Sequence, residues 1–212
     1  MDCVKKVINA GKETLNKVSD MIKLDKSKML NLTNDSIKVG ISTITVAASK
    51  NELSQKTITH DVASKLVGLA VYHIALSDRI EKLEASNEKL KKLNFSLTVK
   101  LTTMVLVSTA LLSGIESLNN EKLMLELAGM AVGIAVHNMF ISKFVDKTGT
   151  KGDARQMVDD WAIVLTISVA TQLVMTRGNL NKTIANLTNP EALKNLISDI
   201  LGRNVASAVD YA

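Results

Sequence analysis

The sequence predicts an all-α protein, a helical bundle, from three observations. The 212 residues include a single proline, so almost nothing interrupts long helices. Aromatic residues make up only 3% of the chain, whereas strands are typically rich in aromatic and β-branched residues. Apolar residues recur every three or four positions over several long stretches, which is the spacing of an amphipathic helix. A chain of this length can form one sizeable core.

The overall charge suits a protein with anionic partners and equally an ordinary, mildly basic soluble protein. The formal net charge is +5, which favours phospholipid head groups or nucleic acid. Cys3 is the only cysteine, which excludes an internal disulfide and a cysteine-based zinc site. The N-terminal segment carries acidic residues and has no apolar central region, so we expect neither a signal peptide nor a transit peptide.

Residues 1–36 are expected to form a basic amphipathic helix followed by a linker. Apolar residues repeat at alternating spacings of four and three between Val4 and Ile22, and lysines occupy the remaining surface. Such a helix can lie on an anionic membrane. The expected contacts are Lys5, Lys6, Lys12 and Lys17. The same pattern suits a helix packed on protein with its lysines in water, and both interpretations stay open. Residues 25–36 are polar and asparagine-rich, as in a linker.

Residues 37–96 are expected to form a helical stalk. The apolar pattern from Ile37 to Val46 fits a short strand or a helix, and we favour a helix because no second strand is predicted to pair with it. Residues 58–77 form a mostly apolar helix. The next segment, RIEKLEASNEKLKKLN (79–94), pairs Glu with Lys and is similar to a short coiled coil. It is expected to continue without a break into the following apolar segment.

Residues 97–177 are expected to form an apolar block of three helices. Three runs carry no formal charge: Leu101–Ile115, Leu127–Ser142 and Trp161–Thr176. Each is slightly shorter than the roughly 20 apolar residues that span a bilayer. Flanking apolar residues can extend them, and Lys100 and Lys143 can extend their side chains to the membrane surface. A water-soluble protein would instead bury the same runs in its core.

The basic residues around these runs favour a membrane. In a protein that crosses the membrane three times, the basic residues before the first run and those between the second and third runs would lie on the same side. The positive-inside rule predicts that this side is cytoplasmic. These basic residues are Lys89, Lys91, Lys92, Lys100, Lys143, Lys147, Lys151 and Arg155. Only Lys122 lies between the first and second runs. Basic residues after the third run, including Arg177 and Lys182, argue against this orientation.

Gly129 and Gly133 lie four positions apart in the second run and are predicted to be a helix-packing site. This G-x-x-x-G spacing lets a partner backbone approach closely, in lipid or in a soluble bundle.

Residues 178–212 are expected to form a C-terminal amphipathic helix and tail. Asn189 is its predicted N-cap, Pro190 its first residue and Gly202 its end. This helix would dock on the chain's own core or on a neighbouring subunit.

No motif predicts an enzyme, a metal site or a cofactor. His60, His73 and His137 lie in no metal-binding pattern, and Glu126 and His137 share a helix face about three turns apart. The segment DKTGTKGD (146–153) lacks the spacing of a phosphate-binding loop and is expected to connect two helices. Asp159 and Asp160 suit the N-terminus of the third apolar helix.

These observations predict a non-enzymatic structural protein embedded in a membrane assembly, with a virion among the candidate assemblies. One alternative is a soluble all-α viral coat or nucleic-acid-packaging protein, and another is a holin-like protein that permeabilises membranes. The expected partners are other copies in a homo-oligomer or large assembly, membrane lipid, and nucleic acid through non-specific phosphate contacts. No small-molecule substrate is expected. The expected location is a membrane or virion, or the cytoplasm or virion interior for the soluble alternative.

Overall fold

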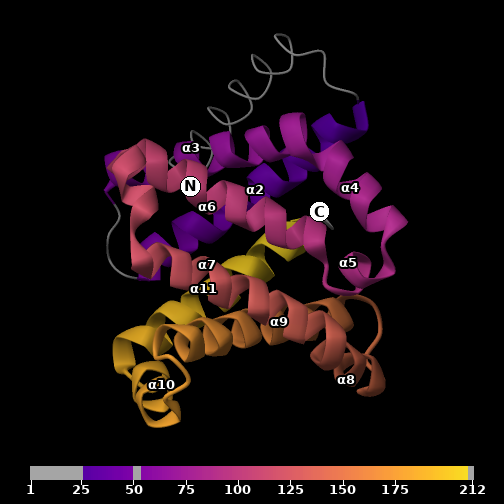
Figure 1. Cartoon of the computed structure of the whole chain (residues 1–212), viewed down its shortest axis with the longest axis vertical. Helices are drawn as coiled ribbons and strands as arrows, with labels where there is room; N and C mark the ends of the chain where they lie inside the picture. The colour runs from indigo at the N-terminus through magenta and orange to yellow at the C-terminus, as the bar shows by residue number, and fades with distance from the viewer. Residues whose placement is uncertain (1–25, 50–53, 210–212) are drawn as a thin grey trace.

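The computed structural model describes residues 26–49 and 54–209, and every regular element in these ranges is a helix. The all-α prediction is therefore confirmed. The predicted N-terminal helix and its four lysines lie outside the described residues. Figure 1 labels the main helices. The elements are α2 (Lys26–Ser49), α3 (Gln55–Val71), the π-helical turn η1 (Tyr72–Leu76), α4 (Ser77–Ser86), α5 (Glu88–Lys92), α6 (Phe95–Ser113), the 3₁₀ turn η2 (Ile115–Asn119), α7 (Glu121–Val136), the π-helical turn η3 (His137–Ile141), α8 (Ser142–Lys147), α9 (Gly152–Met175), α10 (Leu180–Leu187) and α11 (Pro190–Val209).

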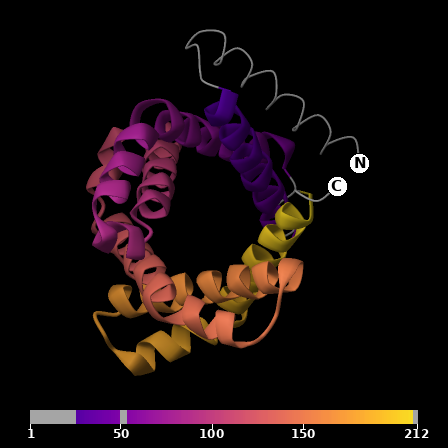
Figure 2. The same ribbon diagram turned by 90° about the vertical axis from the view of Figure 1, so that its right-hand side faces the viewer.

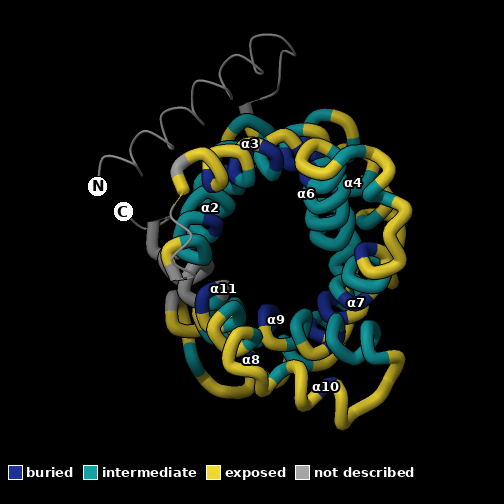
Figure 3. The backbone as a smooth tube through the Cα atoms, turned by 90° about the vertical axis from the view of Figure 1, so that its left-hand side faces the viewer, coloured by how far each residue is buried: buried dark blue, intermediate teal, exposed yellow. Residues whose placement is uncertain are grey.

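The helices are arranged in a closed ring. Contacts run from α2 through α3, α6, α7 and α9 to α11, which packs back on α2. Figures 2 and 3 look along the ring and show that no described helix passes through its middle. The C-terminal helix therefore docks within its own chain, on α2 and α9.

Two helix pairs make the closest contacts along the apolar part of the chain. The three apolar runs fall on α6, on α7 with η3, and on α9. Within this block α7 packs mainly against α9, whereas α6 packs mainly against α3. The α3–α6 pair and the α7–α9 pair are joined through the turn η2.

Asparagine side chains cap four of the described helices. The Oδ1 atoms accept backbone N–H groups in the first turns of α5, α7, α10 and α11, at Asn87, Asn120, Asn179 and Asn189. Each cap satisfies a donor that the helix leaves unpaired. The prediction of Asn189 as an N-cap is confirmed. Gly202 was predicted to end α11 and does not. The backbone remains helical at this glycine, and the helix continues to Val209.

The predicted linker at residues 25–36 is wrong, because the chain is helical from Lys26 onward. Polar side chains are satisfied within the helix: Thr33 Oγ1 donates to the Met29 carbonyl at 2.8 Å, and Ser36 Oγ donates to the Leu32 carbonyl at 2.6 Å. Leu32 is only 1% exposed and packs against Leu69 of α3. Burial of this apolar face outweighs the weak helix propensity of the polar residues.

The charged segment 79–94 does not continue unbroken into the apolar helix. Asn87 is extended between α4 and α5, and Asn94 has a left-handed φ of 51°, which asparagine tolerates better than most residues. Glu84 Oε1 then accepts the backbone N–H of Ser96 at 2.9 Å. The segment therefore turns back onto the start of α6 and does not form a separate stalk.

The two helix pairs are repeats of one construction. Residues 67–71 read VGLAV and residues 132–136 read VGIAV, so Gly68 and Gly133 occupy equivalent positions. A π-helical turn follows each segment directly, beginning at Tyr72 and at His137. Each glycine lies against the backbone of its partner helix, at Met104 of α6 and at Ile167 of α9. Sequence, turn and helix crossing therefore repeat together.

Candidate membrane surface and polar sites

In the part of the chain that the structure describes, three helical segments are long and apolar enough to cross a membrane. They are Phe95–Ser113, Glu121–Lys147 and Ala154–Met175, of 19, 27 and 22 residues. Each contains most or all of one uncharged run and extends it to bilayer length. Only 6%, 22% and 6% of their most apolar stretches are buried, so these segments do not form a buried core in the described chain.

The exposed apolar side chains gather on these segments. Among the described residues, 11 hydrophobic side chains are buried and 21 large ones are exposed. Figure 3 shows the buried positions as short stretches distributed around the ring. Exposed apolar side chains gathered on neighbouring segments mark a surface that lipid or another protein covers. The exposed residues on the three segments are Leu111, Leu112, Met124, Val132, Val136, Met139, Phe140, Phe144, Met157, Trp161, Leu165 and Val169.

Gly129 and Gly133 lie where α7 crosses α9. A Cβ atom at Gly133 would lie 2.5 Å from the Ile167 Cα, and one at Gly129 would overlap the backbone of Thr171. Both distances are shorter than real contacts allow, so these two positions require glycine for the observed approach of the helices. The contact lies inside one chain, between neighbouring apolar segments.

An equivalent close approach on α3 is absent from the sequence-based predictions. A Cβ at Gly68 would lie 2.6 Å from the Met104 Cα of α6. One turn earlier, Ser64 Oγ lies 3.4 Å from Ser108 Oγ. The repeated VG(L/I)AV segment is the signal that could have identified this crossing.

A polar cluster joins three helices at the inner side of the ring. The Asp35 carboxylate of α2 accepts hydrogen bonds from His73 Nε2 of η1 at 2.9 Å and from Lys100 Nζ of α6 at 3.0 Å. The His73 side chain is 7% exposed. Burial raises the pKa of Asp35, but the hydrogen bond from His73 and the positive charge of Lys100 outweigh it and hold the pKa below its usual value. Asp35 is therefore a carboxylate near neutral pH.

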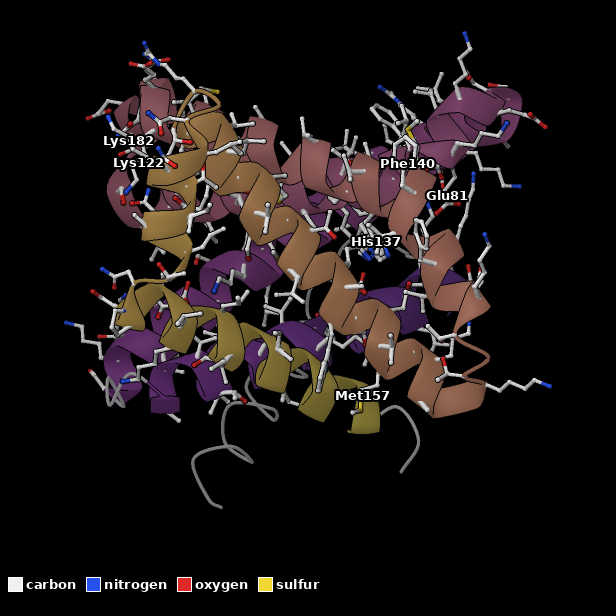
Figure 4. The ribbon with its side chains drawn as sticks, turned by 90° about the horizontal axis from the view of Figure 1, so that it is seen from below. Glu81, Lys122, His137, Phe140, Met157 and Lys182 are labelled. Carbon is white, nitrogen blue, oxygen red and sulfur yellow. The ribbon has the colours of Figure 1, made fainter. Side chains whose placement is uncertain are left out.

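A second histidine lies at the α7–α9 crossing. His137 begins η3 and is 1% exposed, and its Nε2 lies 3.2 Å from Asp159 Oδ1 of α9. Figure 4 shows His137 beside α9. Asp159 does not lie at a helix N-terminus, as the sequence suggested, because α9 begins earlier, at Gly152. Asp159 lies in the third turn of α9 and faces His137 of the neighbouring helical segment.

A groove with charged walls lies between α2, α3, α6 and α9. Its volume is about 330 Å³, and its charged lining residues are Asp35, Lys38, Lys65, Lys100 and Asp160. Lys65 Nζ donates to Asp61 Oδ2 at 2.9 Å and to Thr43 Oγ1 of α2 at 3.3 Å. Charged side chains therefore meet on the inner side of the ring, away from the apolar surface.

The remaining candidate residues do not come together. Glu126 pairs with Lys122 at 3.9 Å and not with His137. The 146–153 segment connects α8 to α9, as expected, and the Asp146 carboxylate pairs with Arg155. Within the described ranges, no group of three histidine, cysteine, aspartate or glutamate side chains is placed to hold a metal ion.

The basic residues divide between the two ends of the apolar segments. Figure 1 shows α5 and α8 at one end and α10 at the other. Figure 4 shows Lys122 and Lys182 together at the α10 end, and Glu81 and Phe140 at the opposite end. Of the eight basic residues predicted to share one side, all except Lys100 belong to α5, to α8, to the short connection after α8 or to the first turn of α9.

Comparison with known proteins gives no match: no family model, no curated protein and no solved structure is significantly similar to this chain. Its function is therefore inferred from its own residues and their arrangement.

Proposed function

We propose that the protein is a membrane-embedded structural protein in which α6, α7 with η3 and α8, and α9 cross the bilayer. The observation that carries this proposal is the exposed apolar surface of the three bilayer-length segments. Burial of that surface in hydrocarbon would contribute about 25 cal/mol for each Å² removed from water.

The direction of the charged groups supports this proposal. A protein in lipid turns ionisable side chains toward its interior and pairs them there, because an isolated charge in hydrocarbon is costly. The Asp35–His73–Lys100 cluster and the Asp61–Lys65 pair follow this pattern. The cluster links side chains of neighbouring helices, and the Asp61–Lys65 pair links two side chains of α3. Contacts of this kind stabilise the fold.

The distribution of basic residues supports one orientation. The end of the bundle that contains α5 and α8 carries Lys89, Lys91, Lys92, Lys143 and Lys147. The end with η2 and α10 carries Lys122, Arg177 and Lys182, and Arg177 pairs with Glu121 at 3.0 Å. By the positive-inside rule, the α5–α8 end would be cytoplasmic.

The single tryptophan supplies a direct test. Trp161 is the only tryptophan of the chain, lies on α9 and is 42% exposed. We would reconstitute the full chain into vesicles whose lipids carry bromine atoms on the acyl chains and measure tryptophan fluorescence against vesicles without bromine. Contact with acyl chains quenches the fluorescence.

The expected result is strong quenching of Trp161. Unquenched fluorescence, together with recovery of a monodisperse protein without detergent, would refute the proposal. That outcome would favour a soluble coat or packaging protein in which other copies cover the apolar surface. The Trp161→Phe variant is the matched control and gives the background signal of the preparation.

A further inference from the structure

We infer that α3 and η1 form a fourth segment whose outer face contacts lipid acyl chains, in the same way as α7 and η3. This inference rests on the proposed function, because it extends the same lipid-facing surface. α3 is not among the three apolar segments, since Asp61 and Lys65 interrupt its apolar pattern. α3 has 17 residues, η1 has 5 and α4 has 10, and the three follow one another directly. Together they exceed the roughly 20 residues that span a bilayer.

The two segments correspond residue by residue. Residues 63–71 read ASKLVGLAV and residues 128–136 read AGMAVGIAV, which align without a gap and are identical at five positions. Buried positions correspond as well: Leu69 is 2% exposed and Ile134 is 0% exposed. Tyr72 and His137, at 4% and 1%, begin the two π-helical turns. The same sides of both segments therefore face the bundle.

The outer faces correspond too, and both are apolar. On α3 and η1 the exposed stripe consists of Ala63, Val67, Val71 and Ala75. On α7 and η3 it consists of Ala128, Val132, Val136 and Phe140. Val71 and Val136 are 38% and 36% exposed. The exposed apolar stripe on α7 belongs to a segment that is long and apolar enough to cross the bilayer. α3 carries an exposed apolar stripe at the equivalent positions.

Asp61 and Lys65, the charged residues in the middle of α3, do not lie on this stripe, whereas Lys56 and His60 continue the exposed face toward the start of the helix. Lys65 donates to Asp61 and to Thr43 of α2, and it lines the inner groove. His73 donates to Asp35, also on α2. Lys65 and His73 are polar residues that have no counterpart of the same type on α7 and η3. The α2 helix provides a hydrogen-bond partner for each of them. Paired inward in this way, these groups are compatible with a lipid-facing outer surface.

The packing of α3 places its stripe beside an apolar segment. Gly68 brings α3 against the backbone of α6, as Gly133 brings α7 against α9. α6 is itself one of the three bilayer-length segments. Because the two crossings repeat, Val71 of α3 is expected at a similar depth in the bilayer to Val136 of α7.

The test compares tryptophans at equivalent positions. In the Trp161→Phe background, Val71→Trp and Val136→Trp would each be reconstituted into vesicles with acyl-chain bromines. Both sites are exposed, so tryptophan fits without disturbing the fold. Val67→Trp and Val132→Trp form a second matched pair in case one variant is unstable. We expect the tryptophans on α3 to be quenched to the same extent as their counterparts on α7.

The outcomes separate this inference from the proposed function. If Trp161 and Val136→Trp are quenched but neither α3 variant is, α3 does not face lipid, and the proposed function stands. If none is quenched, both the proposed function and the inference fail. Quenching of all the tryptophans supports both.

Discussion

Replacing Gly133 with alanine tests the helix crossing on which the apolar part of the fold depends. The substitution adds one methyl group, whose carbon would lie 2.5 Å from the Ile167 Cα, 3.0 Å from the Ile167 nitrogen and 3.1 Å from the Thr166 carbonyl oxygen. All three are backbone atoms of α9, so no side-chain rotation relieves the overlap. An ordinary carbon–carbon contact needs about 3.5 Å, so α9 would have to move by about 1 Å.

The magnitude follows from a matched control. In a helix interior, alanine is more favourable than glycine by about 1 kcal/mol. Gly40 of α2 has nothing within 4 Å of the position of its Cβ, so Gly40→Ala should show this gain alone. Gly133→Ala gains the same amount and loses about 1–3 kcal/mol to overpacking. The difference between the two variants should therefore be about 1–3 kcal/mol, with Gly133→Ala the less stable.

Thermal unfolding in a mild detergent measures this difference. Circular dichroism would follow the loss of helix for the wild type and both variants under the same conditions. Equal midpoints for Gly40→Ala and Gly133→Ala would refute the reasoning, because they would show that α9 does not lie against Gly133 in the folded protein.

The remaining predictions concern coupling, charge and the N-terminal lysines. Combining Gly129→Ala with Gly133→Ala should cost less than the sum of the single changes, since one displacement of α9 relieves both overlaps; additive melting shifts would contradict this. Because the folded-state pKa of Asp35 is lowered, its carboxylate stabilises the fold above the unfolded-state pKa of about 4, and this contribution is lost as the pH falls through the folded-state pKa. Asp35→Asn should therefore lower the melting temperature at pH 7 and approach the wild type at acidic pH, whereas a pH-independent difference would exclude a charge effect. Lys5→Glu with Lys6→Glu should weaken binding to anionic vesicles, and added salt should have the same effect on the wild type. Binding of the double variant at the wild-type level would argue against a lipid contact, and a steep salt dependence on duplex DNA would favour nucleic acid.

The helices themselves could be predicted from the sequence, because apolar spacing and capping residues act locally. Asn189 caps α11 as its position before Pro190 indicates, and the three uncharged runs fall almost entirely within helices. The linker at residues 25–36 could not be excluded by local rules. Its polar side chains suit a loop, and only the burial of Leu32 against Leu69 of α3, a contact distant in sequence, favours the helix.

The candidate sites were less accessible to sequence reasoning. The spacing of Gly129 and Gly133 indicates a close contact, but it does not identify α9 as the partner. The Asp35–His73–Lys100 cluster joins side chains from three separate helical elements, so no local motif contains it. The contact between Asp159 and His137 could not be predicted for the same reason, because it depends on how two helices cross.

The closure of the ring by α11 is the contact of longest sequence separation among the main helix pairs, so we expect it to form last. The α2 and α11 helices meet although most of the chain lies between Ser49, where α2 ends, and Pro190, where α11 begins. The members of each repeated pair are much closer in sequence. Closing such a long loop costs more chain entropy than closing a short one, and distant pairings form slowly. During synthesis, the α3–α6 and α7–α9 pairs can assemble as each emerges from the ribosome. The α2 helix can meet α11 only after the intervening segments, both repeated pairs among them, have been made.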